Sequence, residues 1–270
     1  MGVHIKIGAV VLSIIAFISV IVIGQWHWKN EIRSHENQAQ ALEYTDAMEA
    51  SNDEKEAVSS EKTQDSTDLE KLTAKLPDEV KKKIKAAYND HEQVNVLLSG
   101  GHEISGLASL LEEKLNHTYG ENLFKVTELN FDRKTSMEVY NNDLDAPIAD
   151  QTPDIVIFTS LLINDAGKVS TNDSSQVPLL IKDRILKKSP ETVFMIEPQN
   201  PVTSNPYIND RLEEVEAKAK TAGIPYIDHF SEWPEEDDLK AYLDDKGQYP
   251  NEKGLSLWAG LLANYFTSKK

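Results

Sequence analysis

Side chains suited to acyl-transfer chemistry stand shortly after short apolar runs in this sequence. Ser99 follows VNVLL and precedes two glycines and His102, Asn164 and Asp165 come soon after DIVIFT, and His229 follows PYID. A serine hydroxyl, an imidazole and a side-chain amide are the nucleophile, the base and the oxyanion donor that ester hydrolysis needs. The residue types therefore point first to a serine hydrolase site.

The apolar runs alternate with segments in which apolar residues recur at helical spacing. Runs of β type cover residues 94–98, 123–129, 154–159, 192–197 and 225–228. Helical spacing covers residues 68–89 (interrupted near Pro77), 106–119, 136–142, 177–188, 209–222, 236–243 and 251–266. This alternation predicts an α/β fold, a three-layer α/β/α sandwich with a five-stranded parallel sheet of flavodoxin-like type. Parallel strands bring their carboxyl ends to one edge, so we expect the candidate side chains to lie there.

Three fragments of this region occur in the order found in one hydrolase family. They are the glycine turn after the first strand, Asn164 with Asp165 after the third, and YPNEKG from Tyr249 at the start of the last helix. With these fragments, residues 94–270 resemble the SGNH (GDSL-like) hydrolases. The resemblance implies a nucleophilic Ser in the first block, an oxyanion-hole Asn in the third, and a His base with an Asp partner in the last. It would make Asn164 the oxyanion donor.

The catalytic positions of this sequence depart from the blocks of that family. Gly101 stands where the family has the nucleophilic Ser of GDS, and Ser99 stands where it has Gly. Leu162 replaces the Gly of GxND, Tyr249 replaces the His base, and Lys246 stands three residues before it. Glycine has no oxygen with which to attack an ester, and a phenol with an ordinary pKa near 10 is a poor base at pH 7.

Other residues would have to rebuild the catalytic set in an active enzyme. We take Ser99 as the candidate nucleophile, His102 or His229 as the candidate base, and Asn164 as an oxyanion donor beside the backbone amides of the glycine turn. The residues expected to line the substrate site are Gly100, Gly101, Asp165 and Tyr249. The alternative is structural, with Ser99 ending a strand, His102 exposed, and the remaining candidates serving as turn residues.

Composition excludes several other classes of function. The formal net charge of −17 argues against a binder of nucleic acid, because such proteins concentrate Lys and Arg. The absence of cysteine removes thiol nucleophiles, disulfides and Cys-ligated metal sites. The histidines lack the spacing of a local metal site, and neither GxGxxG nor GxxxxGK[ST] occurs. We therefore expect neither a metal nor a cofactor.

The first 68 residues differ in composition from the rest of the chain. Residues 7–24 carry no charge and approach the length of a membrane span, and Trp26 and Trp28 follow as expected of residues at the membrane interface. We predict an uncleaved transmembrane anchor at residues 1–28, N-inside with the C-terminal domain outside the cell membrane. Residues 29–68 are acidic and poor in apolar residues, which predicts a disordered stalk before a domain at residues 69–270.

Two functions are consistent with this sequence. The first is a membrane-tethered SGNH-type hydrolase that cleaves acyl or acetyl esters of an envelope glycan or lipid. The second is a catalytically inactive SGNH-like domain that binds an envelope carbohydrate or a protein partner. The missing Ser and His of the family blocks favour the second function, whereas the retained Asn164 and the scaffold favour the first.

Overall fold

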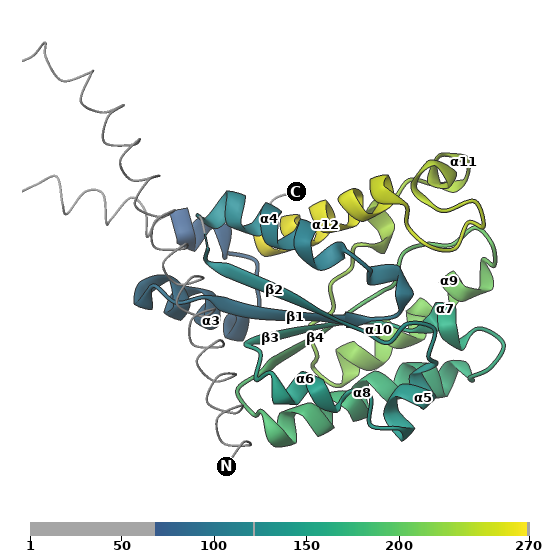
Figure 1. Ribbon diagram of the computed structural model, residues 1–270, viewed down its shortest axis with the longest axis horizontal. Helices are drawn as coiled ribbons and strands as arrows, with labels where there is room; N and C mark the ends of the chain where they lie inside the picture. Colours follow the sequence, from purple (N-terminus) through teal and green to yellow (C-terminus); the bar gives the residue numbers. More distant parts are fainter. Residues whose placement is uncertain (1–67, 121, 269–270) are drawn as a thin grey trace, which may run out of the picture. The chain divides into compact units, whose positions relative to one another are not determined.

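The computed structural model describes residues 68–120 and 122–268 of the 270-residue chain. Within these residues the structure is a parallel sheet with helices on both faces (Figure 1). The strand order is β2-β1-β3-β4. The strands are β1 (Val94–Gly100), β2 (Phe124–Asn130), β3 (Ile155–Thr159) and β4 (Val193–Glu197). The predicted α/β sandwich with a parallel sheet is confirmed.

Helices of two different groups cover the two faces of the sheet. One apolar core joins the sheet to α3 (Asp78–Asp90), α4 (Leu107–Tyr119) and α12 (Glu252–Phe266). The other joins it to α5 (Ser136–Asn141), α6 (Ala146–Asp150), α8 (Thr171–Lys188) and α10 (Leu212–Thr221). Strand side chains alternate between the cores: Leu98 packs in the first and Leu97 in the second. Burial on both faces explains why the strands have nearly continuous apolar sequences.

The prediction of a fifth strand at residues 225–228 is wrong. In the described residues the sheet has four strands, and this segment forms only an isolated parallel bridge between Tyr226 and Ile196. The N–H of Ile196 donates to the Pro225 carbonyl at 3.0 Å, and the N–H of Ile227 donates to the Ile196 carbonyl at 2.9 Å. The chain then turns into a 3-10 helix at Phe230–Glu232, so the ladder does not continue.

Helix boundaries follow capping residues that apolar spacing does not show. The predicted helix at 177–188 begins earlier, at Thr171, because the Ser170 hydroxyl caps it and accepts from the N–H of Asp173. The segment predicted as one helix at 209–222 is divided at Arg211 into α9 (Tyr207–Asp210) and α10. The predicted helix at 236–243 is α11 (Glu236–Leu239) followed by a 3-10 turn at Lys240–Tyr242.

One short helix matters for the candidate site. Helix α7 (Leu162–Asp165) lies in the loop after β3, where the sequence suggested only a turn. Its four residues are all buried, including Asn164 and Asp165. The loop therefore holds both polar side chains against the carboxyl edge of the sheet.

The predicted membrane anchor and nearly all of the predicted stalk lie outside the described residues. In residues 68–120 and 122–268 no helix combines the length and the apolar character that crossing a membrane requires. The anchor at residues 1–28 stays a prediction from the sequence.

The core between the sheet and α8 can be tested at Ile181, a fully buried side chain of that helix. We expect Ile181→Ala to lower the free energy of unfolding by about 2–5 kcal/mol, because the change removes buried carbon atoms and leaves a cavity. The measurement is urea unfolding of the full chain followed by circular dichroism. Lys187→Ala, at an exposed position of the same helix, should change it by less than about 0.5 kcal/mol. Equal effects of the two changes would contradict this core.

Candidate active site

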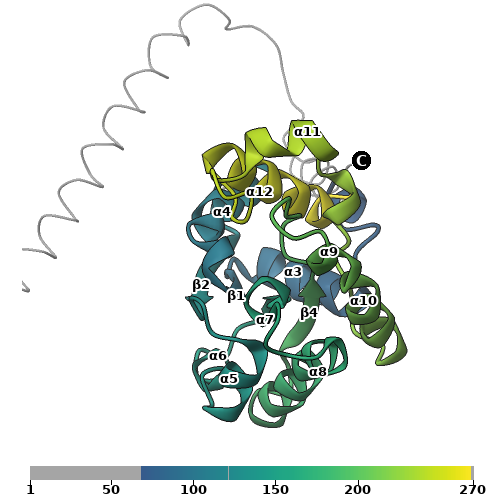
Figure 2. The same ribbon diagram turned by 90° about the vertical axis from the view of Figure 1, so that its right-hand side faces the viewer.

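The carboxyl ends of the four strands meet at the edge of the sheet that faces the viewer in Figure 2. Helix α7 lies near the centre of this view, with α5 and α8 on one side and α12 on the other. The loops after β1, β2 and β3 carry Gly101, Asp132 and Asn164 to this edge. This is the edge at which the sequence predicted the candidate residues to lie.

The position expected for the nucleophile is filled by another side chain. The N–H of Gly101 donates to Oε1 of Glu103 at 3.0 Å. A Cβ atom at Gly101 would lie 2.5 Å from Oε2 of Glu103 and 2.8 Å from Nδ2 of Asn164. The carboxyl group of Glu103 therefore occupies the space into which a side chain at position 101 would extend. We call this space, between Gly101, Glu103 and Asn164, the slot. Glu103 is 2% exposed, and its Oε2 makes no hydrogen bond to any described residue.

Burial controls the protonation of this carboxyl group. Desolvation raises the pKa of Glu103 to about 7, opposed by hydrogen bonds from its own backbone N–H and from that of Gly101. The negative charge of Glu197 raises the pKa of Glu103 further. A carboxyl group that titrates near neutral pH thus lies in the slot beside Asn164.

The amide of Asn164 is already engaged by the protein itself. Its Nδ2 donates to the backbone carbonyls of Asp132 and Lys134, each at 3.0 Å. A side-chain amide has two N–H groups, so neither remains for a developing oxyanion in this arrangement. In the structure, Asn164 joins the loop after β2 to α7.

Asp165 is a structural residue in the same loop. Its Oδ1 accepts from the N–H of Ser136 at 2.7 Å and its Oδ2 accepts from the Ser136 hydroxyl at 2.6 Å. Both partners belong to the first residue of α5, so the buried carboxylate fixes where that helix begins. Both of its oxygens thus accept hydrogen bonds from Ser136.

Tyr249 and His102 lie together at the rim of the slot. Their ring centroids are 5.0 Å apart in an edge-to-face arrangement, and His102 keeps 45% of its side chain exposed. Nδ1 of His102 is 3.7 Å from Oδ1 of Asp132. Burial raises the pKa of the Tyr249 phenol above its ordinary value, and the charge of Glu103 adds to this, against an opposing effect of Arg133. A phenol in this environment is still less able to act as a base at neutral pH.

The side chain of Ser99 is enclosed in the core of the domain. It belongs to β1, is fully buried, and its Oγ has no hydrogen-bond partner in the described part of the chain. Because side chains alternate along a strand, Ser99 lies on the same face as Leu97, in the core that contains α8. His229 packs against Trp258 in the core on the other face. The structure therefore separates the candidate nucleophile from this candidate base.

His229 belongs to a buried polar network after β4. Its Nδ1 accepts from the indole N–H of Trp233 at 3.1 Å, so the proton is on Nε2, which donates to the Pro198 carbonyl at 3.0 Å. The same nitrogen is 3.3 Å from Oε2 of Glu197, which also accepts from the Trp258 indole N–H at 3.2 Å. Both ring nitrogens of His229 are thus engaged inside the domain.

Sequence reasoning missed both buried glutamates of this edge. Glu197 ends the apolar run TVFMIE, where a charge in a buried strand is unusual and marks a polar network. Its Oε1 accepts from the Thr159 hydroxyl at 2.7 Å. Glu103 is two residues after Gly101 in a 3-10 turn at His102–Ile104, and no pattern in the sequence shows that its side chain folds back.

Asp244 holds the loop before α12. Lys246 stands where the resemblance would place the Asp partner of the base. Oδ1 of Asp244 accepts from the N–H of Gln248 at 2.8 Å and from the N–H of Tyr249 at 3.2 Å. These bonds fix the turn that presents Tyr249. No group of three His, Asp or Glu side chains suited to a metal ion occurs among the described residues.

Comparison with known proteins decides the type of fold. No protein-family profile matches this sequence, and no curated protein is significantly similar to it. Similar solved structures include a protein assigned to the lipolytic G-D-S-L family from Desulfitobacterium hafniense (17% identity, TM-score 0.51), which covers 63% of this chain and 99% of that one. A family 3 carbohydrate esterase from Clostridium thermocellum (11%, 0.54) covers 64% and 95%, and an acetyl xylan esterase (12%, 0.51) covers 62% and 96%. The chain has the SGNH hydrolase fold.

Several residues that differ from the SGNH family blocks lie close together in this structure. Gly101, Glu103 and Asn164 meet at the slot, and Tyr249 lies at its rim beside His102. The proposed roles of Ser99, His102 and His229 stay predictions, because the arrangement pairs no serine hydroxyl of this set with an imidazole in the described residues.

The pKa of Glu103 predicts a specific dependence of stability on pH. The folded state raises it from 4.5 to about 7, so the stabilising protonated state is complete below pH 4.5 and is lost as the pH rises through 7. Between pH 4.5 and pH 8 we expect the wild type to lose about 3 kcal/mol of unfolding free energy relative to Glu103→Gln. Urea unfolding across this range measures the difference. A difference independent of pH would contradict the buried titrating carboxyl.

The steric relation at the slot can be tested by a double-mutant cycle. We expect Gly101→Ala to destabilise the protein by about 1–3 kcal/mol, because its methyl group meets Glu103 and Asn164. In a Glu103→Ala background this cost should fall by about 1 kcal/mol or more. Gly260→Ala in α12 is the matched control, since nothing lies within 4 Å of its added methyl group. Additive effects of the two slot changes would show that Glu103 does not fill the space.

Proposed function

We propose that this domain is a non-catalytic SGNH-fold module that binds an envelope glycan. The observation that carries the proposal is the Glu103 carboxyl group in the space of the missing nucleophile at Gly101. A covalent acyl intermediate needs a nucleophile at a position that substrate can reach. Here that position has no side-chain oxygen of its own and is closed by a buried carboxyl group.

The other two parts of acyl-transfer chemistry are also altered. Both N–H groups of the Asn164 amide are donated to backbone carbonyls, and Tyr249 is a phenol with a raised pKa. Losing one oxyanion donor typically costs on the order of a hundredfold in rate, and a missing base adds to the loss. These three departures at one site favour binding over turnover.

Two open cavities outside the slot, both lined mainly by polar and charged residues, support a binding role. They lie on either side of the first turn of α8, with volumes of about 630 and 680 Å³. Such volumes are typical of ligand sites. The first is lined by Asp132, Arg133, Lys134, Thr135, Met137, Glu138, Lys168, Val169, Ser170 and Asp173, and the second by Thr171, Tyr207, Asp210, Arg211, Glu213 and Glu214. Charged and polar side chains beside apolar surface suit a sugar, which has hydroxyl groups at its edges and an apolar ring face. Two of the similar structures are carbohydrate or xylan esterases by description.

The place of action follows from the N-terminal sequence. We propose that residues 1–28 anchor the chain in the cell membrane, with its N-terminus inside, and that residues 29–68 act as a spacer. The domain would then reach a glycan of the envelope outside the membrane.

A hydrolase of acyl or acetyl esters in an envelope glycan or lipid is the second candidate. The likeness to esterase structures and the retained position of Asn164 beside residue 101 favour it. It would require Ser99 to turn out of β1 toward His102, or a bond between Ser99 and His229 through a rearranged sheet edge.

The two candidates differ in turnover. We expect the full chain, purified in a mild detergent, to hydrolyse neither p-nitrophenyl acetate nor p-nitrophenyl butyrate above buffer, and to resist labelling by a fluorophosphonate probe. We also expect it to cosediment with isolated envelope glycan. An active esterase assayed in the same detergent is the control for the substrates.

Ester hydrolysis by the full chain would contradict the non-catalytic proposal. Turnover that disappears in Ser99→Ala and in either His102→Ala or His229→Ala would establish a rebuilt serine hydrolase and identify its base. Neither turnover nor cosedimentation, in a folded protein, would contradict the glycan-binding proposal as well.

A further inference from the structure

One aromatic side chain stands out on the surface of the domain. Among the described residues, Tyr207 is the one large hydrophobic residue that is exposed, with 79% of its surface accessible. Pro206 precedes it at the start of α9. An isolated exposed aromatic ring is ordinary on a protein surface, so its surroundings decide whether it has a role.

The segment that carries Tyr207 is firmly held. The side chain of Asn209 accepts from the N–H of Val202 at 3.2 Å and donates to the Val202 carbonyl at 3.1 Å. The N–H of Thr203 donates to the Gly247 carbonyl at 2.9 Å, which ties the segment to the loop before Tyr249. Hydrogen bonds to neighbouring segments therefore fix the backbone on both sides of Tyr207.

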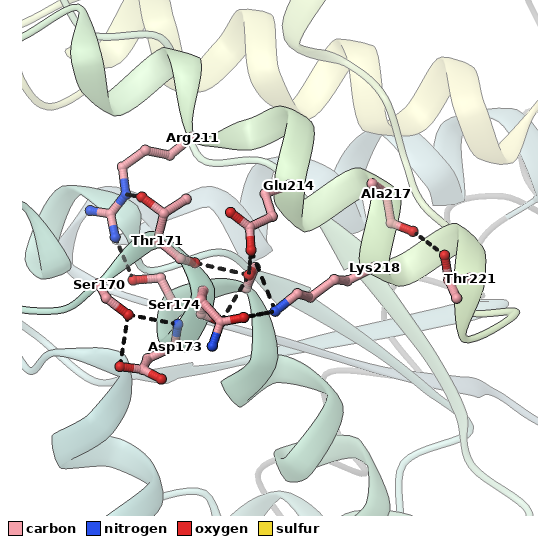
Figure 3. A network of polar contacts seen from close by, with 11 residues as sticks. Ser170, Thr171, Asp173, Ser174, Arg211, Glu214, Ala217, Lys218 and Thr221 are labelled. Carbon is pink, nitrogen blue, oxygen red and sulfur yellow. Dashed lines mark hydrogen bonds and ion pairs between the residues drawn. The ribbon is translucent and has the colours of Figure 1, made fainter.

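Tyr207 forms one wall of the 680 Å³ cavity beside α8. Arg211 also lines this cavity, and its guanidinium donates to the Thr171 hydroxyl at 3.2 Å and to the Ser174 hydroxyl at 2.7 Å (Figure 3). It also donates to the Val169 carbonyl at 2.9 Å. Glu214 is bound by Lys218 at 3.5 Å and by the Ser175 hydroxyl at 3.1 Å. The charged groups of Arg211 and Glu214 thus have partners within the protein.

Two carboxylates at the cavity are different. Asp210 and Glu213 line it, are exposed, and make no side-chain hydrogen bond or ion pair within the described ranges. The nearby cations, Arg211 and Lys218, are engaged elsewhere. The cavity therefore combines an open aromatic face with uncompensated negative charge, which is the environment that attracts an organic ammonium group.

We propose that this cavity binds an amino-sugar unit of a glycan, with the apolar face of the sugar ring on Tyr207 and its ammonium group near Asp210 and Glu213. The choice of a glycan rests on the proposed function. The lining also favours a glycan over a protein, since a stable protein interface needs an apolar core and Tyr207 supplies a single exposed aromatic residue.

The test is calorimetric titration of the full chain in detergent at mildly acidic pH. The probes are the tetramer of β-1,4-linked glucosamine, the same tetramer fully N-acetylated, and a lysine-containing peptide. We expect the glucosamine tetramer to bind about tenfold more tightly than its acetylated form, because acetylation removes the positive charge. Raising the salt concentration should weaken this binding.

Variants locate the site. Tyr207→Ala should weaken binding of the glucosamine tetramer about fivefold or more, whereas Tyr207→Phe keeps the ring and should stay within about twofold. Asp210→Asn combined with Glu213→Gln should weaken it about tenfold. The loss of stability should be small, because neither carboxylate has a side-chain partner and each only adds a favourable charge to the first turn of a helix. Glu113→Gln, at an exposed position of α4, is the matched control and should have no effect.

Several results would overturn the inference. They are equal affinity for the two tetramers, no binding of the glucosamine tetramer, or binding unaffected by the Tyr207 and carboxylate variants. Tighter binding of the lysine peptide with the same dependence on Tyr207 would assign the cavity to a protein partner instead. Cosedimentation with envelope glycan that persists in Tyr207→Ala would leave the proposed function standing and reject this site alone.

Discussion

The hydrogen bond from the N–H of Gly101 to the buried carboxyl group of Glu103 sets what the carboxyl edge of the sheet can do. It holds a side chain in the slot beside Asn164, where an SGNH-type hydrolase would need room for its nucleophile and for an ester. The bond is possible only because residue 101 has no Cβ, since a methyl group there would lie 2.5 Å from the carboxylate. Loss of the nucleophile and closure of the slot are therefore two aspects of one arrangement.

Other polar residues of this edge make hydrogen bonds that connect parts of the fold. The amide of Asn164 joins the loop after β2 to α7, and the carboxylate of Asp165 fixes the start of α5. His229 and Glu197 hold the two tryptophans of the first core. The amide of Asn164, the carboxylate of Asp165 and the ring nitrogens of His229 are bonded to protein, which offsets the cost of about 1–3 kcal/mol that an unpaired buried polar group carries. The Ser99 hydroxyl and Oε2 of Glu103 have no such partner among the described residues.

Openings for a ligand lie farther out, on both sides of the first turn of α8. The cavity at Tyr207 has an aromatic wall and two carboxylates without side-chain partners among the described residues. Arg211, which also lines it, is bonded to the Ser174 hydroxyl. Recognition by such a surface needs no covalent step. It agrees with a domain that keeps the SGNH scaffold as a support for binding.

The sequence by itself determined the alternation of strands and helices, the parallel sheet and the edge that carries the site, because apolar spacing and strand order follow from local patterns. It also showed that Gly101 and Tyr249 lack the groups expected of a serine hydrolase. Only the tertiary structure decided that Glu103 fills the slot, that Ser99 and His229 lie on opposite faces of the sheet, and that residues 225–228 form a bridge rather than a strand. These features depend on where side chains and distant segments meet in space, and hydrogen bonds between residues far apart in the sequence leave no periodic signal along the chain.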